Sequence, residues 1–90
     1  MSVAEQFGAN LRRCRKRAGL SQEETAVRAS LHRTAVGQLE RGERVARADT
    51  IAKLAGVLGV DPGGLFDGIA WEPGNIRHGR FKSSGTPDGA

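Results

Sequence analysis

Residues 21–42 read SQEETAVRASLHRTAVGQLERG, and this stretch holds the signals of two short helices separated by a turn. Ser21 and Glu24 have the spacing of a capping box, in which each side chain accepts a hydrogen bond from the backbone N–H of the other at a helix start. The helix that begins there is expected to end near Arg28, because the apolar pattern stops over residues 29–32.

The apolar pattern resumes with Ala35, Val36 and Leu39, and Gly42 follows as a natural helix stop. On a projection of the helix that contains Ala35, Val36 and Leu39, the apolar side chains lie on one side. The opposite side carries Arg33, Thr34, Gly37, Gln38 and Arg41. Such a face suits a DNA major groove, where arginine can bond guanine, glutamine can bond adenine and a threonine methyl can touch thymine. An ordinary solvated face is the alternative interpretation.

The sequence on either side of this stretch predicts three more helices. A stripe at intervals of three and four residues predicts a helix over residues 3–18, with Cys14 as a core residue. The same spacing recurs at Ile51, Leu54, Ala55 and Leu58, before Gly59, and Asp61-Pro62 indicates a last short helix over residues 62–66. Five helices and no strand are therefore expected over residues 3–66, which is an all-α fold.

The segments GLSQEETA at residues 19–26 and LERG at residues 39–42 resemble the Cro and phage-repressor (XRE-type) helix-turn-helix family. The likeness continues through KLA at residues 53–55 and LGV at residues 58–60 to LF at residues 65–66. This resemblance implies a compact five-helix, lambda-repressor-like DNA-binding domain over residues 1–66. Its second and third helices would form the helix-turn-helix, and members usually bind a pseudo-palindromic operator as homodimers.

The resemblance also implies roles for individual residues. Arg33, Thr34 and Gln38 match base-reading positions, and Gly37 lies among them, where it either allows close approach to DNA or is merely tolerated. Gln22 matches a phosphate-contacting position at the start of the second helix. The arginines expected to contact further phosphates are Arg12, Arg41, Arg44 and Arg47.

Arg15 and Glu40 match a family pair that bridges the first helix to the end of the third, which implies a structural role. Three residues depart from the family pattern. Ser30 replaces a turn glycine, although a left-handed backbone has a steric cost for other residues. His32 stands where a serine or threonine cap is usual, and Arg47 replaces a small capping residue.

Composition limits the classes of function. The 90 residues include 14 Lys+Arg and 10 Asp+Glu, a net charge of +4, and residues 1–66 hold 11 and 7 of these (11 − 7 = +4). This excess favours an anionic partner such as double-stranded DNA. One cysteine and two histidines offer neither a disulfide nor a zinc motif. We therefore expect no metal, no cofactor, no enzyme activity and no membrane span, in a cytoplasmic protein.

Residues 67–90 form a C-terminal extension that is expected to be irregular or β-like. Ile69 and Trp71 alternate with other residues as in a short strand, and residues 79–82, which include Phe81, could be its partner. The extension could pack on the first and fifth helices or join a dimer mate. A partly ordered extension with Trp71 covering the core is the other alternative.

The leading hypothesis is a sequence-specific DNA-binding transcriptional regulator, repressor-like and homodimeric. The alternative is an antitoxin that regulates its own gene through the same domain and binds a toxin enzyme through residues 67–90. A third hypothesis is an adaptor that uses the helical fold for protein contacts only.

Overall fold

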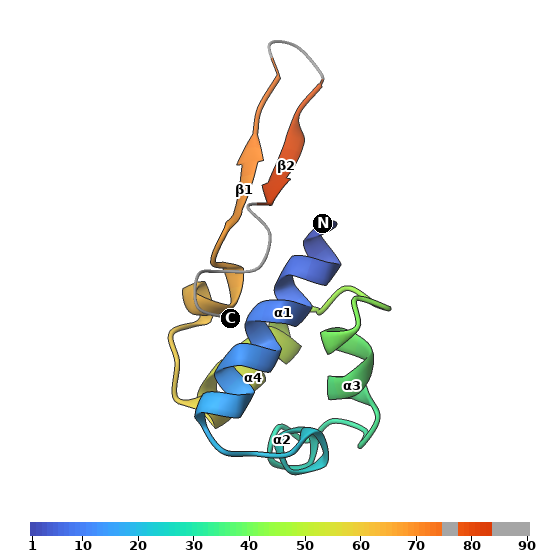
Figure 1. The fold of residues 1–90 in the computed structure, drawn as a ribbon, viewed down its shortest axis with the longest axis vertical. Coiled ribbons are helices and arrows are strands. Elements are labelled where there is room, and N and C mark those ends of the chain that lie inside the picture. The colour runs from blue at the N-terminus through green and yellow to red at the C-terminus, as the bar shows by residue number, and fades with distance from the viewer. Residues whose placement is uncertain (75–77, 84–90) are drawn as a thin grey trace.

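The computed structural model describes residues 1–74 and 78–83 of the chain. These residues form a helical body from which a β-hairpin projects (Figure 1). The elements, in chain order, are α1 (Val3–Arg17), α2 (Gln22–Arg28), α3 (Ala35–Glu40), α4 (Ala48–Leu58), the 3₁₀ helix η1 (Pro62–Phe66), β1 (Ile69–Glu72) and β2 (Arg80–Ser83).

The expectation of five α-helices was wrong at its last member, because the structure has four α-helices and a 3₁₀ helix over the described residues. Asp61 begins η1 as predicted, and its carboxylate accepts a hydrogen bond from the N–H of Gly63 at 2.9 Å. Two glycines follow Pro62, and glycine loses the most backbone freedom in a helix. The element therefore remains one tight turn.

The helix starts follow local chemistry. The predicted capping box at Ser21 and Glu24 is present, and Ser2 and Glu5 form a second one at the start of α1. At the other end of the body, α4 stops at Gly59, whose φ of 67° is the left-handed conformation that glycine tolerates. These boundaries fix the lengths of the helices that surround the core.

The core forms where α1 packs against α3 and η1, and where α4 packs against α2 and η1. Its fully enclosed side chains include Leu11, Val36, Leu39, Leu54 and Leu65, and Cys14 is buried among them as expected. A Cβ atom at Gly8 would lie 2.3 Å from the carbonyl oxygen of Leu39. Only glycine therefore allows α1 to pack this closely against the backbone of α3.

A buried polar network joins α1 to the chain that follows η1. The side-chain amide of Asn10 donates to the carbonyl oxygens of Leu65 at 2.9 Å and Asp67 at 2.8 Å. Gln6, also fully buried, donates to the side chain of Asn10 and to the carbonyl of Asp67. Because buried backbone carbonyls need partners, these two amides hold the base of the hairpin on α1.

The β-like extension is confirmed as an antiparallel hairpin in which Trp71 faces Phe81. The two rings are 5.0 Å apart in an edge-to-face arrangement, and 55% of Trp71 and 59% of Phe81 remain exposed. The alternative in which Trp71 covers the core was wrong, because its ring packs on Phe81 and over Gly79 instead. The hairpin has its base near the N-terminal end of α1, and its far end points away from α2 (Figure 1).

Among the helices in the described part of the chain, none combines the length and apolar character of a membrane span.

Candidate nucleic-acid interface

The turn between α2 and α3 has the left-handed residue that the family pattern predicts. Ser30 adopts φ = 56°, and the N–H of Leu31 donates to the carbonyl of Ala26 at 2.8 Å. Serine has a steric cost in this conformation, which a glycine would avoid. Despite this steric cost, the chain makes a tight turn at Ser30, and α3 follows α2 after that turn.

The first half of the expected readout face lies before α3. Arg33 and Thr34 belong to a turn, and α3 itself starts at Ala35. The expectation that they lie on the helix was therefore wrong. In this turn the ring Nδ1 of His32 accepts from the backbone N–H of Thr34 at 3.2 Å and lies 2.9 Å from the Thr34 hydroxyl, whereas Thr34, the N-cap residue of α3, makes no side-chain capping bond.

The three side chains expected to read bases lie on accessible parts of this segment. Arg33 and Thr34 are exposed, and Gln38 is half-buried one helical turn beyond Thr34. The side-chain carbonyl of Gln38 accepts from Arg44 Nη1 at 3.2 Å, so a residue of the following loop orients it. Sequence patterns gave no indication of this contact, because it depends on how the loop folds back.

Gly37 does not lie on the accessible outer face, where it was expected. The residue is buried, and a Cβ atom there would lie 3.1 Å from both Gln22 Oε1 and Arg41 Nη1. These two side chains cover Gly37, which was therefore wrongly expected on the accessible face. The missing side chain makes room for Gln22 to cross toward Glu40.

Glu40 gathers three elements at one carboxylate. Arg15 of α1 donates to it through Nε at 2.5 Å and Nη2 at 3.1 Å, and Gln22 of α2 donates to its Oε1 at 3.0 Å. The side chain of Arg15 is 11% exposed, and that of Glu40 is 4% exposed. The hydrogen bond to Glu40 raises the pKa of Arg15 above its ordinary value. The negative charge of α3 is thus neutralised inside the protein.

Gln22 therefore makes a contact other than the phosphate contact that was expected of it. It is half-buried and its amide nitrogen is directed to Glu40. In this arrangement its N–H₂ group positions α2 against α3. A contact of Gln22 with phosphate remains a prediction, and it would require the amide to be shared with or released from Glu40.

The other expected phosphate contacts lie mainly on the segment that leaves α3. Arg41 pairs with Glu43 at 2.5 Å, and this hydrogen bond lowers the pKa of the Glu43 carboxyl. Arg47 lies 3.6 Å from Asp49, and both side chains are largely exposed. Arg12 is exposed on α1, on the same stripe as Arg15 and Gly8, which contact α3. Arg41, Arg44 and Arg47 thus follow α3 along the chain, whereas Arg12 lies on α1.

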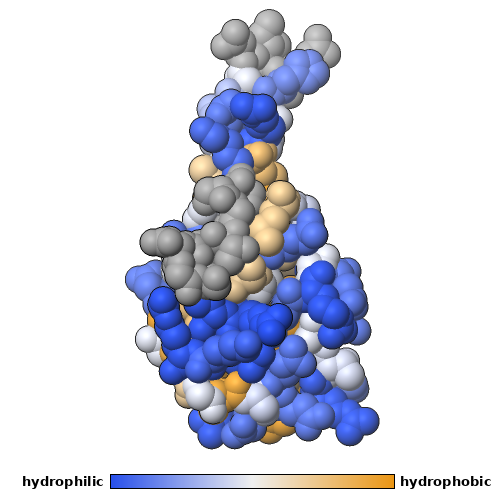
Figure 2. All heavy atoms as spheres, in the orientation of Figure 1, coloured by the Kyte–Doolittle hydropathy of each residue, from blue (hydrophilic) through white to orange (hydrophobic). Residues whose placement is uncertain are grey.

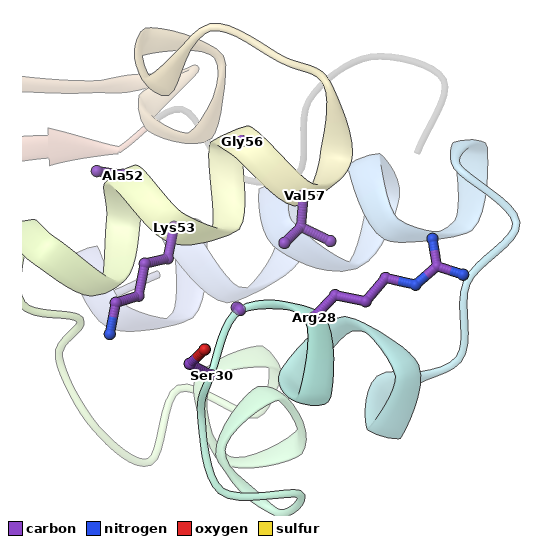
Figure 3. Close-up of a pocket in the computed structure, with 7 residues that line it drawn as sticks. Arg28, Ser30, Ala52, Lys53, Gly56 and Val57 are labelled. Carbon is purple, nitrogen blue, oxygen red and sulfur yellow. The ribbon is translucent and has the colours of Figure 1, made fainter.

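A second surface feature is a shallow groove of about 320 Å³ between the end of α2 and α4. Figure 3 shows that Arg28 and Lys53, its two charged lining residues, point away from each other. The groove therefore lacks a convergent set of polar groups. The described residues also contain no group of three or more His, Cys, Asp or Glu side chains arranged to hold a metal ion.

Comparison with known proteins gives a family for the segment that carries this geometry. A family model described as a helix-turn-helix domain matches residues 6–65. The control protein C.BamHI of Bacillus amyloliquefaciens is 40% identical over 62 residues, which cover 68% of this chain and 76% of that protein.

Two solved structures share both sequence and fold with the chain. The restriction-modification controller protein C.AhdI of Aeromonas hydrophila matches with a TM-score of 0.68 and 43% identity, covering 70% of this chain and 96% of that one. A hypothetical transcription factor, NHTF, from Neisseria matches with a TM-score of 0.68 and 34% identity, over 71% and 74% of the two chains. The chain belongs to the helix-turn-helix family, with α2 and α3 as its helix-turn-helix.

Proposed function

We propose that this protein is a sequence-specific DNA-binding transcriptional regulator that acts as a homodimer on a pseudo-palindromic operator. The observation that carries the proposal is the accessible segment at the start of α3, where Arg33, Thr34 and Gln38 offer side chains suited to base edges. These residues would enter the major groove, and the arginines around the end of α3 would contact the flanking phosphates.

The electrostatics around α3 support this proposal. Glu40 would repel DNA if its charge were exposed, but Arg15 and Gln22 satisfy both of its oxygens within the protein. The nearby Glu43 is exposed and pairs with Arg41. Phosphate binding by Arg41 would therefore replace its contact with Glu43 by a contact with a phosphate oxygen. The contact with phosphate would form only on DNA.

The relatives support the regulatory part of the proposal. Two of them are controller or control proteins by description, and one is described as a hypothetical transcription factor. None of these three is described as an antitoxin. We therefore propose gene regulation alone.

The test is selection of bound duplexes from a random DNA library with the purified protein. The expected result is an enriched palindrome whose half-sites lie about one helical turn, roughly 34 Å, apart. Arg33→Ala or Gln38→Ala should then weaken binding by about 1–3 kcal/mol and relax the preference at one base position.

Lys53→Ala is a matched control, because Lys53 lies on the α2–α4 groove and not at the start of α3. It should leave the base preferences unchanged. Failure to enrich any sequence, together with equal binding of all duplexes by the Arg33→Ala variant and the unmodified protein, would contradict the proposal.

A further inference from the structure

The side-chain amide of Gln38 has only one of its two polar atoms engaged by the protein. Its carbonyl oxygen Oε1 accepts a hydrogen bond from Arg44 Nη1 at 3.2 Å. Its nitrogen Nε2 donates to no acceptor in the part of the chain that the structure describes. The group that Gln38 presents to a partner is therefore a donor, the N–H₂ group.

The backbone at the end of α3 brings Arg44 to this position. Gly42 adopts φ = 71°, and its N–H donates to the carbonyl of Leu39 at 3.1 Å. The N–H of Glu43 donates to the carbonyl of Gln38 at 3.0 Å. Together with the left-handed glycine, these two bonds form a Schellman motif, which satisfies the last carbonyls of a helix. Arg44 is the next residue, so the main chain itself places it beside Gln38.

This turn is also packed against α1. A Cβ atom at Gly42 would lie 2.7 Å from the Cγ atom of Glu5 and 3.1 Å from its backbone. The start of the loop is therefore held from two sides, by its own hydrogen bonds and by α1. Figure 2 shows mostly hydrophilic residues on this side of the helical body, at the level of α3 and the loop after it (right in this view). The contact between Gln38 and Arg44 thus belongs to an accessible polar surface.

Arg44 differs in its charge balance from the other arginines that follow α3. Arg41 pairs with Glu43, and Arg47 lies 3.6 Å from Asp49. Over residues 1–74 and 78–83, no carboxylate forms an ion pair with Arg44. A guanidinium has five N–H donors, of which Gln38 uses one. An uncompensated positive charge and further donors therefore lie beside the free N–H₂ group of Gln38.

The major-groove edges of the two purines differ in a way that this arrangement can detect. Guanine offers the acceptors N7 and O6, whereas adenine offers the acceptor N7 and the donor N6–H₂. A glutamine with both polar atoms free bonds adenine, because its oxygen accepts from N6 while its nitrogen donates to N7. In this protein the oxygen keeps one lone pair, but the adjacent guanidinium repels the amino group that would use it. The two acceptors of guanine would meet donors alone.

We propose that Arg44 is a positioning residue that determines specificity through Gln38. It holds Gln38 as a donor, so that the protein prefers guanine over adenine at the base that Gln38 contacts. The inference rests on the proposed function and names the base that this part of the site takes. It gives Arg44 a role other than the phosphate contact expected of it, whereas Arg41 and Arg47 keep that prediction.

The test begins with the base that Gln38 contacts. Selection from a random duplex library, with the unmodified protein and with Gln38→Ala, identifies it as the position whose preference this substitution abolishes. We expect guanine there for the unmodified protein. Two duplexes that differ only in guanine or adenine at this position then measure the preference, which should be about 10-fold in favour of guanine.

Arg44→Met removes the donor and the charge but keeps a long side chain. Gln38 then has both polar atoms free, so this variant should select adenine and reverse the preference between the two duplexes. An unchanged melting temperature checks that the fold is retained. Arg47→Ala is the matched control, because it removes an exposed arginine from the same side of α3 that pairs with Asp49 and not with Gln38. It should weaken binding to both duplexes by the same factor and keep the preference for guanine.

A double substitution shows whether Arg44 acts through Gln38 or contacts the base itself. In the Gln38→Ala background, Arg44→Met should leave the ratio of the two affinities unchanged, since no amide remains to be held. An equal change of this ratio in both backgrounds would assign the base contact to Arg44 directly and would overturn the proposal.

Three other results would also overturn it while DNA is still bound. These are selection of adenine by the unmodified protein at this position, an Arg44→Met variant that still prefers guanine, and a Gln38→Ala variant that changes no position. Failure of the unmodified protein to enrich any duplex would instead contradict the proposed function, and the inference with it. The two kinds of failure are therefore distinguishable.

Discussion

Glu40 is the residue on which the geometry of the helix-turn-helix depends most. Its carboxylate receives hydrogen bonds from α1 and α2 while belonging to α3, so one side chain fixes the mutual arrangement of three helices. Burial makes this contact sensitive to truncation, because removing one member of a buried pair leaves the other charge without compensation.

We expect Glu40→Ala to lower the free energy of unfolding by about 3 kcal/mol, because it leaves the Arg15 guanidinium largely buried and unpaired. Urea denaturation measures this change. Glu43→Ala provides the matched control, since its pair with Arg41 is more than half exposed at both ends and should change stability by less than about 1 kcal/mol. Equal effects of the two substitutions would show that burial does not distinguish these pairs.

His32 shapes the turn before α3. Its Nδ1 accepts the N–H of Thr34 and also contacts the hydroxyl of this proposed base-reading residue. The ring therefore positions Thr34 from outside the helix.

We expect His32→Ala to lower stability by about 1 kcal/mol through loss of this hydrogen bond and to weaken the base preference at the position read by Thr34. His32→Asn should restore most of both, because an asparagine oxygen can accept the same N–H. Denaturation and a repeated DNA selection measure the two effects. A loss of stability without any change in base preference would limit His32 to a purely structural role.

At the scale of elements, two helices begin with the same device. In α1 and α2 a serine hydroxyl accepts from the N–H of a glutamate three residues on, and the glutamate accepts from the N–H of the serine. The bond from the serine N–H lowers the pKa of Glu5 and of Glu24 below the ordinary value of 4.5. The ionised forms are thus favoured in the folded protein.

Both glutamates should therefore make the protein less stable in acid. A carboxyl whose pKa is lower in the folded state contributes stability above its unfolded pKa and loses that contribution as pH falls through the folded value. We expect the melting temperature to fall between about pH 5 and pH 3. Glu24→Gln should start lower at neutral pH and show a smaller decrease over this range, and an unchanged decrease would contradict this account.

Local signals in the sequence predicted most helices, because caps and apolar stripes act over a few residues. The Ser21 capping box and the stop at Gly59 follow from such signals. The start of α3 was misplaced because the pattern over residues 31–34 fits a turn as well as a helix.

Features that depend on two distant elements could not be predicted in this way. The close contact of Gly8 with α3 depends on how two helices cross, and the burial of Gly37 depends on side chains of Gln22 and Arg41. Asn10 also looked like an ordinary polar residue of α1, although it binds carbonyls 55 and 57 positions later. The sequence contains one indication of this network: two polar residues, Gln6 and Asn10, lie four positions apart beside a core position.

At the scale of the whole molecule, charge and apolar surface are separated. The net excess of +4 lies within residues 1–66, whereas the large exposed aromatic pair lies on the hairpin. One end of the molecule therefore offers electrostatic attraction and the other offers an apolar contact. The proposed DNA contact should therefore weaken as the salt concentration rises.

We expect Arg47→Ala to weaken binding to all duplexes and to reduce the salt slope by about one, because one phosphate contact is lost. Titrations at several salt concentrations measure this slope. Arg28→Ala is the control, since Arg28 lies beside α4 at the far end of α2 (Figure 3) and should leave the slope unchanged. A parallel loss in both variants would indicate a general charge effect instead of a defined contact.

The amide of Asn10 links the position of the hairpin to that of the DNA-reading segment. Because it holds the carbonyls of Leu65 and Asp67, the base of the hairpin is held on α1, and α1 contacts α3 through Gly8 and Arg15. A shift of α1 would therefore move the hairpin and the DNA-reading segment together.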